Sequence, residues 1–354
     1  MDKAKVLEFI ETSFLSEILE EKDVTDISFN GQDIYYVTNT KGRMKSQMVI
    51  DPLKIKDFLR QISNLCEAQF SFTEPILDLS IGRYRINAVH NAIAKVADEG
   101  VTTFSIRIAS PQIRINDDSD FFTPEVRLLL MELIKTRNSI VIGGITSSGK
   151  TELQKYILMN LRANERVIVV DNVLELDQIR NPNIDLTCWL SDDANIHANP
   201  GLLIKNALRN NPDWIILAES RDKEMVDVLN SAMTGMPVIT TLHSQDVFSM
   251  PFRMGRMMMK SEQKIDYEQA IKDINYHFHF YFYLKKKEVD GKIKRYVAQV
   301  MFVDNNGTQT LIYERNSENV KCRKLPQEAI CYFDLNQANY EFKNIYLENY
   351  NEQY

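Results

Sequence analysis

Hydrophobic and polar residues follow two periods in the first part of the chain. Apolar residues recur at helical spacing over residues 6–19 and again over residues 53–66. Between and after these segments, apolar and polar residues alternate one by one, as in half-buried strands, over residues 26–31, 34–37, 83–89 and 103–108. The pattern predicts a mixed α/β domain over residues 1–110.

A different pattern begins at Thr123 and Pro124, which are typical of a helix N-cap followed by the first helical residue. Apolar segments at 139–142, 167–170, 214–217 and 238–242 then alternate with helical segments from residue 150 and over 202–208 and 225–233. This alternation is typical of a parallel sheet covered by helices. From about residue 276, strands over 278–284 and 295–303 with an Asp290-Gly291 turn indicate an antiparallel meander.

These patterns predict two domains joined by a linker over residues 111–122, which contains Pro111 and an acidic run. The second domain would cover residues 123–354, with a carboxy-terminal β/helical extension over about 276–354. No motif is apparent in residues 310–354.

A glycine-rich phosphate loop lies between the apolar strand at 139–142 and the helical segment from residue 150. Its residues are Gly144, Ile145, Thr146, Ser147, Ser148, Gly149, Lys150 and Thr151. Glycines let backbone N–H groups turn toward phosphates at the positive end of a helix. The lysine reaches the β and γ phosphates, and the threonine hydroxyl holds Mg²⁺. The spacing therefore predicts a nucleotide-binding site.

Two of the predicted strands end in an acidic residue, Asp171 and Glu219. Phosphoryl transfer needs an acid at the metal and a group that positions water. The pattern does not say which residue does which. His243 follows the strand at 238–242 and, taken alone, is more typical of a structural histidine.

Composition mainly excludes other classes of protein. With 44% hydrophobic and 26% charged residues, the chain of 354 residues should fold as a globular protein. Its net charge of −7 argues against direct nucleic-acid binding. The four cysteines form no C-x-x-C pair, which argues against structural zinc. The chain has no apolar run as long as a membrane span and no signal-peptide pattern, so we expect a cytoplasmic protein.

The order and spacing of four motifs resemble the type II/type IV secretion ATPase family, the ring-forming motors of secretion, conjugation and pilus assembly. After the phosphate loop, residues 165–176 resemble its acidic box, 207–221 its Walker B region and 240–244 its His box. Residues 24–31, 75–78, 82–89 and 105–107 resemble signatures of its amino-terminal domain. The sequence looks most similar to the type IV secretion and tight-adherence pilus branch, because the four-cysteine metal module of many type II members is absent.

The resemblance implies a RecA-like P-loop NTPase domain preceded by a smaller α/β domain, with six subunits in a ring. It also implies ATP and Mg²⁺ as cofactors, and inner-membrane components of a secretion or pilus apparatus as partners. The protein would then act at the cytoplasmic face of the membrane, where peripheral association with the membrane is expected.

The same resemblance assigns roles to single residues. Asp171 matches the acid thought to polarise water, Glu219 would order Mg²⁺ and water, with Thr151 as the other metal ligand, and His243 would sense the γ-phosphate. Arg85 and Arg107 match positions from which the family directs arginines at the nucleotide.

Three residues depart from the family pattern. Ser147 replaces a loop glycine, Asn172 replaces an acid, and Met236 replaces a histidine. These departures are consistent with one alternative, an ATP-binding scaffold with little hydrolysis. A second alternative is a DNA-translocating ring with the same core fold, although the net negative charge of the chain argues against it.

Three further clusters have a simple structural interpretation. The methionines over residues 254–259 are typical of a helix that fills a core. The basic residues over 285–295 are typical of a solvated hairpin, although they could contact anionic lipid. His277 and His279 lack a third ligand and are better explained as strand residues than as a metal pair.

Overall fold

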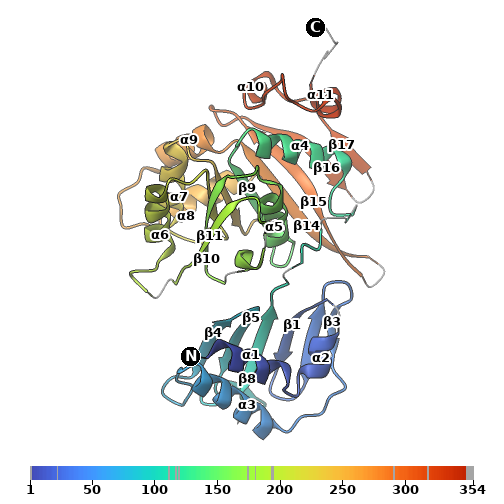
Figure 1. The fold of residues 1–354 in the computed structure, drawn as a ribbon, viewed down its shortest axis with the longest axis vertical. Helices are drawn as coiled ribbons and strands as arrows, with labels where there is room; N and C mark the ends of the chain where they lie inside the picture. Colours follow the sequence, from blue (N-terminus) through green and yellow to red (C-terminus); the bar gives the residue numbers. More distant parts are fainter. Residues whose placement is uncertain are drawn as a thin grey trace. The chain divides into compact units, whose positions relative to one another are not determined.

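The computed structural model describes residues 2–21, 23–110, 112–115, 118, 120–173, 175–179, 181–192, 195–289, 292–316 and 319–347. The chain divides into two compact units, Met1–Pro111 with Glu288–Ile293, and Gln112–Lys287 with Lys294–Tyr354 (Figure 1). The predicted turn at residues 290–291 lies outside the described residues, as do residues 111, 116, 117 and 119 of the predicted linker.

The first unit contains an antiparallel sheet with the strand order β3-β2-β1-β8-β5-β4. Its strands are β1 (Val24–Phe29), β2 (Ile34–Thr38), β3 (Gly42–Lys45), β4 (Ile76–Ile81), β5 (Tyr84–Val89) and β8 (Thr103–Ile108). Three helices, α1 (Lys3–Glu11), α2 (Ser16–Glu20) and α3 (Pro52–Leu65), share a hydrophobic core with the sheet. A small ribbon, β6 (Lys95–Val96) and β7 (Glu99–Gly100), completes the unit.

The apolar pattern over residues 6–19 forms two helices instead of one. The hydroxyl of Ser13 donates to the carbonyl of Ile10 at 2.7 Å and accepts from the N–H of Leu15 at 3.2 Å. Such side-chain bonds compete with the helical hydrogen bonds of the backbone. The chain therefore leaves α1 at Glu11 and starts α2 at Ser16.

The second unit is built on a sheet with the strand order β11-β10-β12-β13-β9-β14-β15-β16-β17. The parallel strands are β9 (Ile140–Gly144), β10 (Arg166–Asp171), β11 (Asp185–Leu190), β12 (Trp214–Leu217), β13 (Val238–Leu242) and β14 (Phe280–Val289). The antiparallel part contains β15 (Lys292–Val303), β16 (Gln309–Asn316) and β17 (Asn319–Cys322). The parallel sheet and the later meander are both confirmed.

Helices cover both faces of this sheet, because alternate residues of the buried strands point to opposite sides. Ile140 and Ile142 join one core, while Val141 between them joins the other. The first core includes α4 (Pro124–Lys135), α5 (Lys150–Asn160), α10 (Gln327–Ile330) and α11 (Tyr340–Tyr346). The second includes α6 (Pro200–Ala207), α7 (Met225–Met233), α8 (Met250–Met258) and α9 (Tyr267–His277). Figure 1 shows the two helix layers.

The methionines of α8 fill the second core, as predicted. Met254, Met257 and Met258 are buried there, while Met259, directly after the helix, is exposed. Among the described residues, the segment 310–354, in which the sequence shows no motif, contributes most of β16 together with β17, α10 and α11. In this segment, the hydroxyl of Tyr346 on α11 donates to the carbonyl of Glu125 on α4 at 3.2 Å.

The two histidines near residue 278 are not strand residues, since His277 ends α9 and His279 precedes β14. Nδ1 of His279 lies 2.8 Å from the carbonyl oxygen of Val303, and Nε2 lies 2.7 Å from the hydroxyl of Tyr332. Burial lowers the pKa of His279. A neutral ring that donates from Nδ1 and accepts at Nε2 therefore links the sheet to the carboxy-terminal segment. Across the described part of the chain, no helix is long and apolar enough to cross a membrane.

Candidate nucleotide-binding site

The phosphate loop connects the central strand β9 to the first turn of α5. Gly149, the N-cap residue, has φ of +101°, and a Cβ there would lie 2.9 Å from the ring of Phe121. Only glycine combines this backbone conformation with such a close approach. The N-terminus of α5 is thus open toward the loop, in the arrangement that binds phosphate groups.

Ser147 occupies the position where the sequence lacks the expected glycine, and its φ is +60°. This left-handed conformation favours glycine, because a Cβ crowds the neighbouring carbonyl. The carbonyl oxygen of Ser147 accepts a hydrogen bond from Nε of Arg295 at 2.8 Å. The departure from the family pattern therefore falls on a residue whose backbone conformation is costly for serine.

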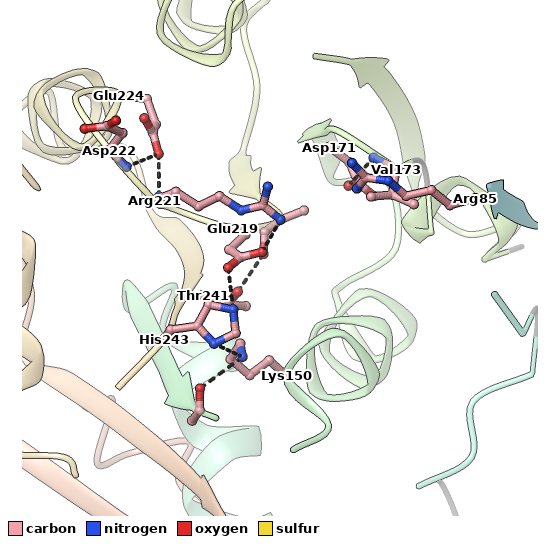
Figure 2. Close-up of polar contacts among 12 residues, drawn as sticks. Arg85, Lys150, Asp171, Val173, Glu219, Arg221, Asp222, Glu224, Thr241 and His243 are labelled. Atoms are coloured by element: carbon pink, nitrogen blue, oxygen red, sulfur yellow. Dashed lines mark hydrogen bonds and ion pairs between the residues drawn. The ribbon is translucent and has the colours of Figure 1, made fainter. Parts of the chain in front are cut away.

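Lys150 is the buried cation of the loop. Its Nζ donates to the carbonyl oxygens of Gly144 at 3.0 Å and Ile145 at 3.2 Å, and it lies 3.3 Å from Nδ1 of His243 (Figure 2). These contacts place the ammonium group at the mouth of the loop, where the predicted phosphate site lies. Thr146 and Ser148 belong to the same loop, and Thr151 lies in the first turn of α5.

His243 connects the lysine to Glu219. Nε2 of His243 lies 2.9 Å from Oε1 of Glu219, and Nη2 of Arg221 donates to Oε2 of Glu219 at 2.6 Å (Figure 2). Glu219 follows β12 and His243 follows β13, and these parallel strands are paired neighbours. Three of the predicted site residues, Lys150, Glu219 and His243, therefore meet at the carboxyl ends of adjacent strands.

The charges in this cluster set the protonation of His243 and Glu219. Burial and the ammonium of Lys150 lower the pKa of His243, which favours the neutral ring. With Lys150 donating to Nδ1, the ring proton stands on Nε2 and faces Glu219. Burial acts to raise the pKa of Glu219, but the hydrogen bond and charge of Arg221 outweigh it and, with the ammonium of Lys150, hold that pKa below its ordinary value. Glu219 is thus ionised at neutral pH.

Asp171 is buried at the end of β10, one sheet position away from β12. Its Oδ1 accepts from the N–H of Val173 at 3.0 Å, and its Oδ2 accepts from the N–H groups of Glu175 at 2.9 Å and Leu176 at 3.4 Å. Burial raises the pKa of Asp171, against the effect of these donors. Both carboxylate oxygens therefore hold the last residues of the segment that resembles the acidic box.

Three residues of the site were not found by sequence reasoning. One is Arg221, which donates to Glu219. Gln154 donates from Nε2 to the carbonyl of Leu217 at 3.2 Å, and the hydroxyl of Thr241 donates to the carbonyl of Ala218 at 2.8 Å. They tie α5 and β13 to the end of β12. Gln154 could have been found from its spacing, since it lies one helical turn after Lys150.

Glu152 joins the start of the second unit to the phosphate-binding helix. Its Oε2 accepts from the backbone N–H of Arg114 at 2.8 Å, and its Oε1 pairs with the buried ammonium of Lys155 at 3.0 Å. Glu152 is the residue directly after Thr151, so the first turn of α5 is anchored on both sides.

Arg85 and Arg107 belong to the first unit, on β5 and β8, where they are direct partners across the sheet. Arg85 Nη2 lies 3.3 Å from Oδ2 of Asp78, and Arg107 Nε lies 3.3 Å from Oδ1 of Asp26. Each arginine thus has an acidic partner that the sequence analysis did not identify. These pairs are largely exposed, so they should contribute little to stability.

A family model described as "Type II/IV secretion system protein" matches residues 89–279. An uncharacterized protein of Bacillus anthracis is 28% identical over 332 residues, which are 89% of this chain and 73% of that protein. The type IV secretion system protein VirB11 of Bartonella quintana is 31% identical over 142 residues, 40% of each chain.

Among solved structures, the X-ray structure of the Legionella pneumophila ATPase DotB has a TM-score of 0.59 at 20% identity, covering 83% of this chain and 80% of that one. This likeness shows a shared mixed α/β fold. The family match spans more than half of the 354 residues and includes the phosphate loop, Asp171, Glu219 and His243. The resemblance seen in the motifs is therefore confirmed, and the chain belongs to the type II/IV secretion system protein family.

Proposed function

We propose that this protein is an ATP-hydrolysing motor that drives type IV secretion, conjugation or pilus assembly. The observation that carries the proposal is the contact of Lys150 with His243, and of His243 with Glu219, beside an open helix N-terminus. The names of two relatives support it, since VirB11 is a type IV secretion protein and DotB is an ATPase.

Each residue of the cluster has a definite chemical task in this proposal. Lys150 and the N–H groups of the loop bind the phosphates of ATP and balance their charge. Glu219, ionised at neutral pH, helps to order Mg²⁺ and the attacking water. His243 contacts Lys150 and Glu219 and would sense the γ-phosphate.

Mg²⁺ is proposed as the metal, with Thr151 and Glu219 as its protein ligands. A hydroxyl group and an ionised carboxylate are hard oxygen donors, which Mg²⁺ prefers. When bound, the metal would neutralise charge on the transferred phosphoryl group.

Asp171 has two proposed roles. One is the role implied by the family, an acid that polarises water. The other follows from its hydrogen bonds, which anchor residues 173–176 near the site. Arg85 and Arg107 are proposed to stabilise transition-state charge, as arginine fingers do. In that role each would exchange its carboxylate partner for phosphate oxygens.

The assembly is proposed to be a hexameric ring of RecA-like domains at the cytoplasmic face of the membrane, docked on inner-membrane components of the apparatus. Closed rings bring groups from neighbouring subunits to one site. Sedimentation with ATP and Mg²⁺ tests this, and a protein that stays monomeric at micromolar concentration would contradict the ring.

The decisive experiment measures phosphate release from ATP by the full chain. Lys150→Ala should abolish nucleotide binding, while Glu219→Gln should bind ATP and lose most turnover. Lys260→Ala, at an exposed lysine paired with Asp222, is the matched control and should behave as wild type. If wild type releases phosphate no faster than Lys150→Ala, the motor proposal is wrong.

A second candidate is a scaffold that binds ATP and hydrolyses little. The contact that favours it is the 2.6 Å hydrogen bond from Arg221 to Glu219, which occupies a carboxylate oxygen needed for catalysis. Tight ATP binding with turnover equal to Glu219→Gln would support the scaffold. Stimulation of turnover by DNA would instead support the translocating ring.

A further inference from the structure

Arg295, on β15, contacts the phosphate loop although it is 148 residues away from Ser147 in sequence. Its Nε donates to the carbonyl oxygen of Ser147 at 2.8 Å. Its Cδ lies 3.8 Å from the place where a Cβ on Gly149 would stand, so the aliphatic stem also approaches the loop. All three residues belong to the second unit.

The peptide between Ser147 and Ser148 is held at both of its polar groups. Its N–H, on Ser148, donates to the carbonyl of Ile145 at 3.2 Å, and its carbonyl accepts from Arg295. The left-handed conformation of Ser147 costs free energy for a residue with a Cβ. Such a conformation persists when the surrounding structure over-determines it. For Ser147, the guanidinium of Arg295 is a contact from outside the loop that holds this conformation.

The two ends of the phosphate loop, at Gly144 and Gly149, are packed closely against other residues. At Gly144, a Cβ would lie 2.4 Å from Oγ of Ser148 and 2.8 Å from the carbonyl oxygen of Leu284 on β14. At Gly149, it would meet the ring of Phe121. Ser147, in the middle of the loop, is exposed, and the hydrogen bond from Arg295 to its carbonyl oxygen sets the direction of the peptide there.

We propose that Arg295 is a positioning residue for the phosphate loop and that it offsets the cost of serine at position 147. By holding the Ser147 carbonyl away from the loop interior, it keeps the backbone N–H groups in the conformation that binds phosphate. The inference rests on the proposed function, since it concerns the affinity of the same loop for ATP.

The test is a double-mutant cycle with Arg295→Met and Ser147→Gly. Arg295→Met keeps the stem and removes the donor, and Arg295→Lys keeps the charge without the planar Nε donor. The readouts are the Kd for a fluorescent ATP analogue with Mg²⁺, and KM and kcat for phosphate release. Lys294→Met is the matched control, because Lys294 is adjacent but pairs with Asp120 at 2.8 Å.

Arg295→Met should raise Kd and KM about three- to tenfold, the effect of losing one hydrogen bond that is exposed to solvent, with kcat changed by less than about twofold. Arg295→Lys should fall between Arg295→Met and wild type. In the Ser147→Gly background, Arg295→Met should raise Kd by less than about twofold, because glycine adopts the left-handed conformation without help. Lys294→Met should match wild type.

An unchanged Kd in Arg295→Met, or the same rise in Kd in the serine and glycine backgrounds, would overturn the inference while leaving the motor proposal intact. A wild-type protein that binds the analogue no more tightly than Lys150→Ala would overturn both. The urea midpoint of every variant is measured without nucleotide. The midpoints are compared in both backgrounds. If Arg295→Met lowers the urea midpoint in the serine and in the glycine background alike, the role of Arg295 is not specific to the loop.

Discussion

Asp171→Asn separates the two roles proposed for the buried acid at the end of β10. The substitution keeps the size of the side chain but replaces one carboxylate oxygen by an NH₂ group. That group is a donor, and it would face backbone N–H groups that are themselves donors. The asparagine loses fewest hydrogen bonds when its NH₂ faces Val173, because its remaining oxygen then still accepts from Glu175 and Leu176.

The expected change in the free energy of unfolding follows from the one hydrogen bond that Asp171→Asn removes. One buried backbone N–H loses its acceptor, which costs about 1–3 kcal/mol of the free energy of unfolding. Removal of the buried charge offsets part of this cost, because burial already raises the pKa of Asp171. We therefore expect a net loss of about 1–2 kcal/mol. A role in water activation alone predicts no loss of stability and a large fall in kcat.

The assay is urea unfolding without nucleotide, followed by phosphate release at saturating ATP. A lower urea midpoint with an unchanged slope indicates lost stability. Asp185→Asn is the control, because Asp185 is an exposed acid whose pair with Arg166 should contribute below about 1 kcal/mol. If Asp171→Asn has the urea midpoint of wild type, the anchoring role is refuted. If it also retains full turnover, neither role stands.

Three other outcomes are expected. The pKa of buried His279 is below its ordinary value, so the unfolded chain binds more protons than the folded chain. The free energy of unfolding should therefore fall as pH drops below about 6.5. His279→Gln should flatten that part of the pH profile of stability, and an unaltered profile would contradict the reasoning. Gly144→Ala should weaken binding of an ATP analogue at least about tenfold, because its Cβ would overlap Oγ of Ser148; equal affinity would show that the loop relaxes. Met254→Ala should cost about 2–5 kcal/mol in urea unfolding, whereas Met259→Ala should cost far less; similar losses would contradict the core assignment.

Local chemistry made the phosphate loop and the strand ends predictable. The loop spacing and the acids after two apolar strands lie within short segments, so periodicity was enough to locate Lys150 and Glu219. Contacts between distant segments could not be read in this way. Thr123 begins α4 as predicted, but its hydroxyl donates to Tyr313, 190 residues away, instead of capping the helix. The bond between Arg295 and the loop is another such contact.

The bond between Glu152 and Arg114 has a mechanical consequence. One of the connections between the two units leads into Arg114, whose backbone N–H is bonded to Glu152 on α5, one residue after Thr151. Tension applied along that connection would reach the first turn of α5 through a carboxylate that the ammonium of Lys155 also holds. A change in the pull along this connection would therefore act on the helix turn that carries Thr151.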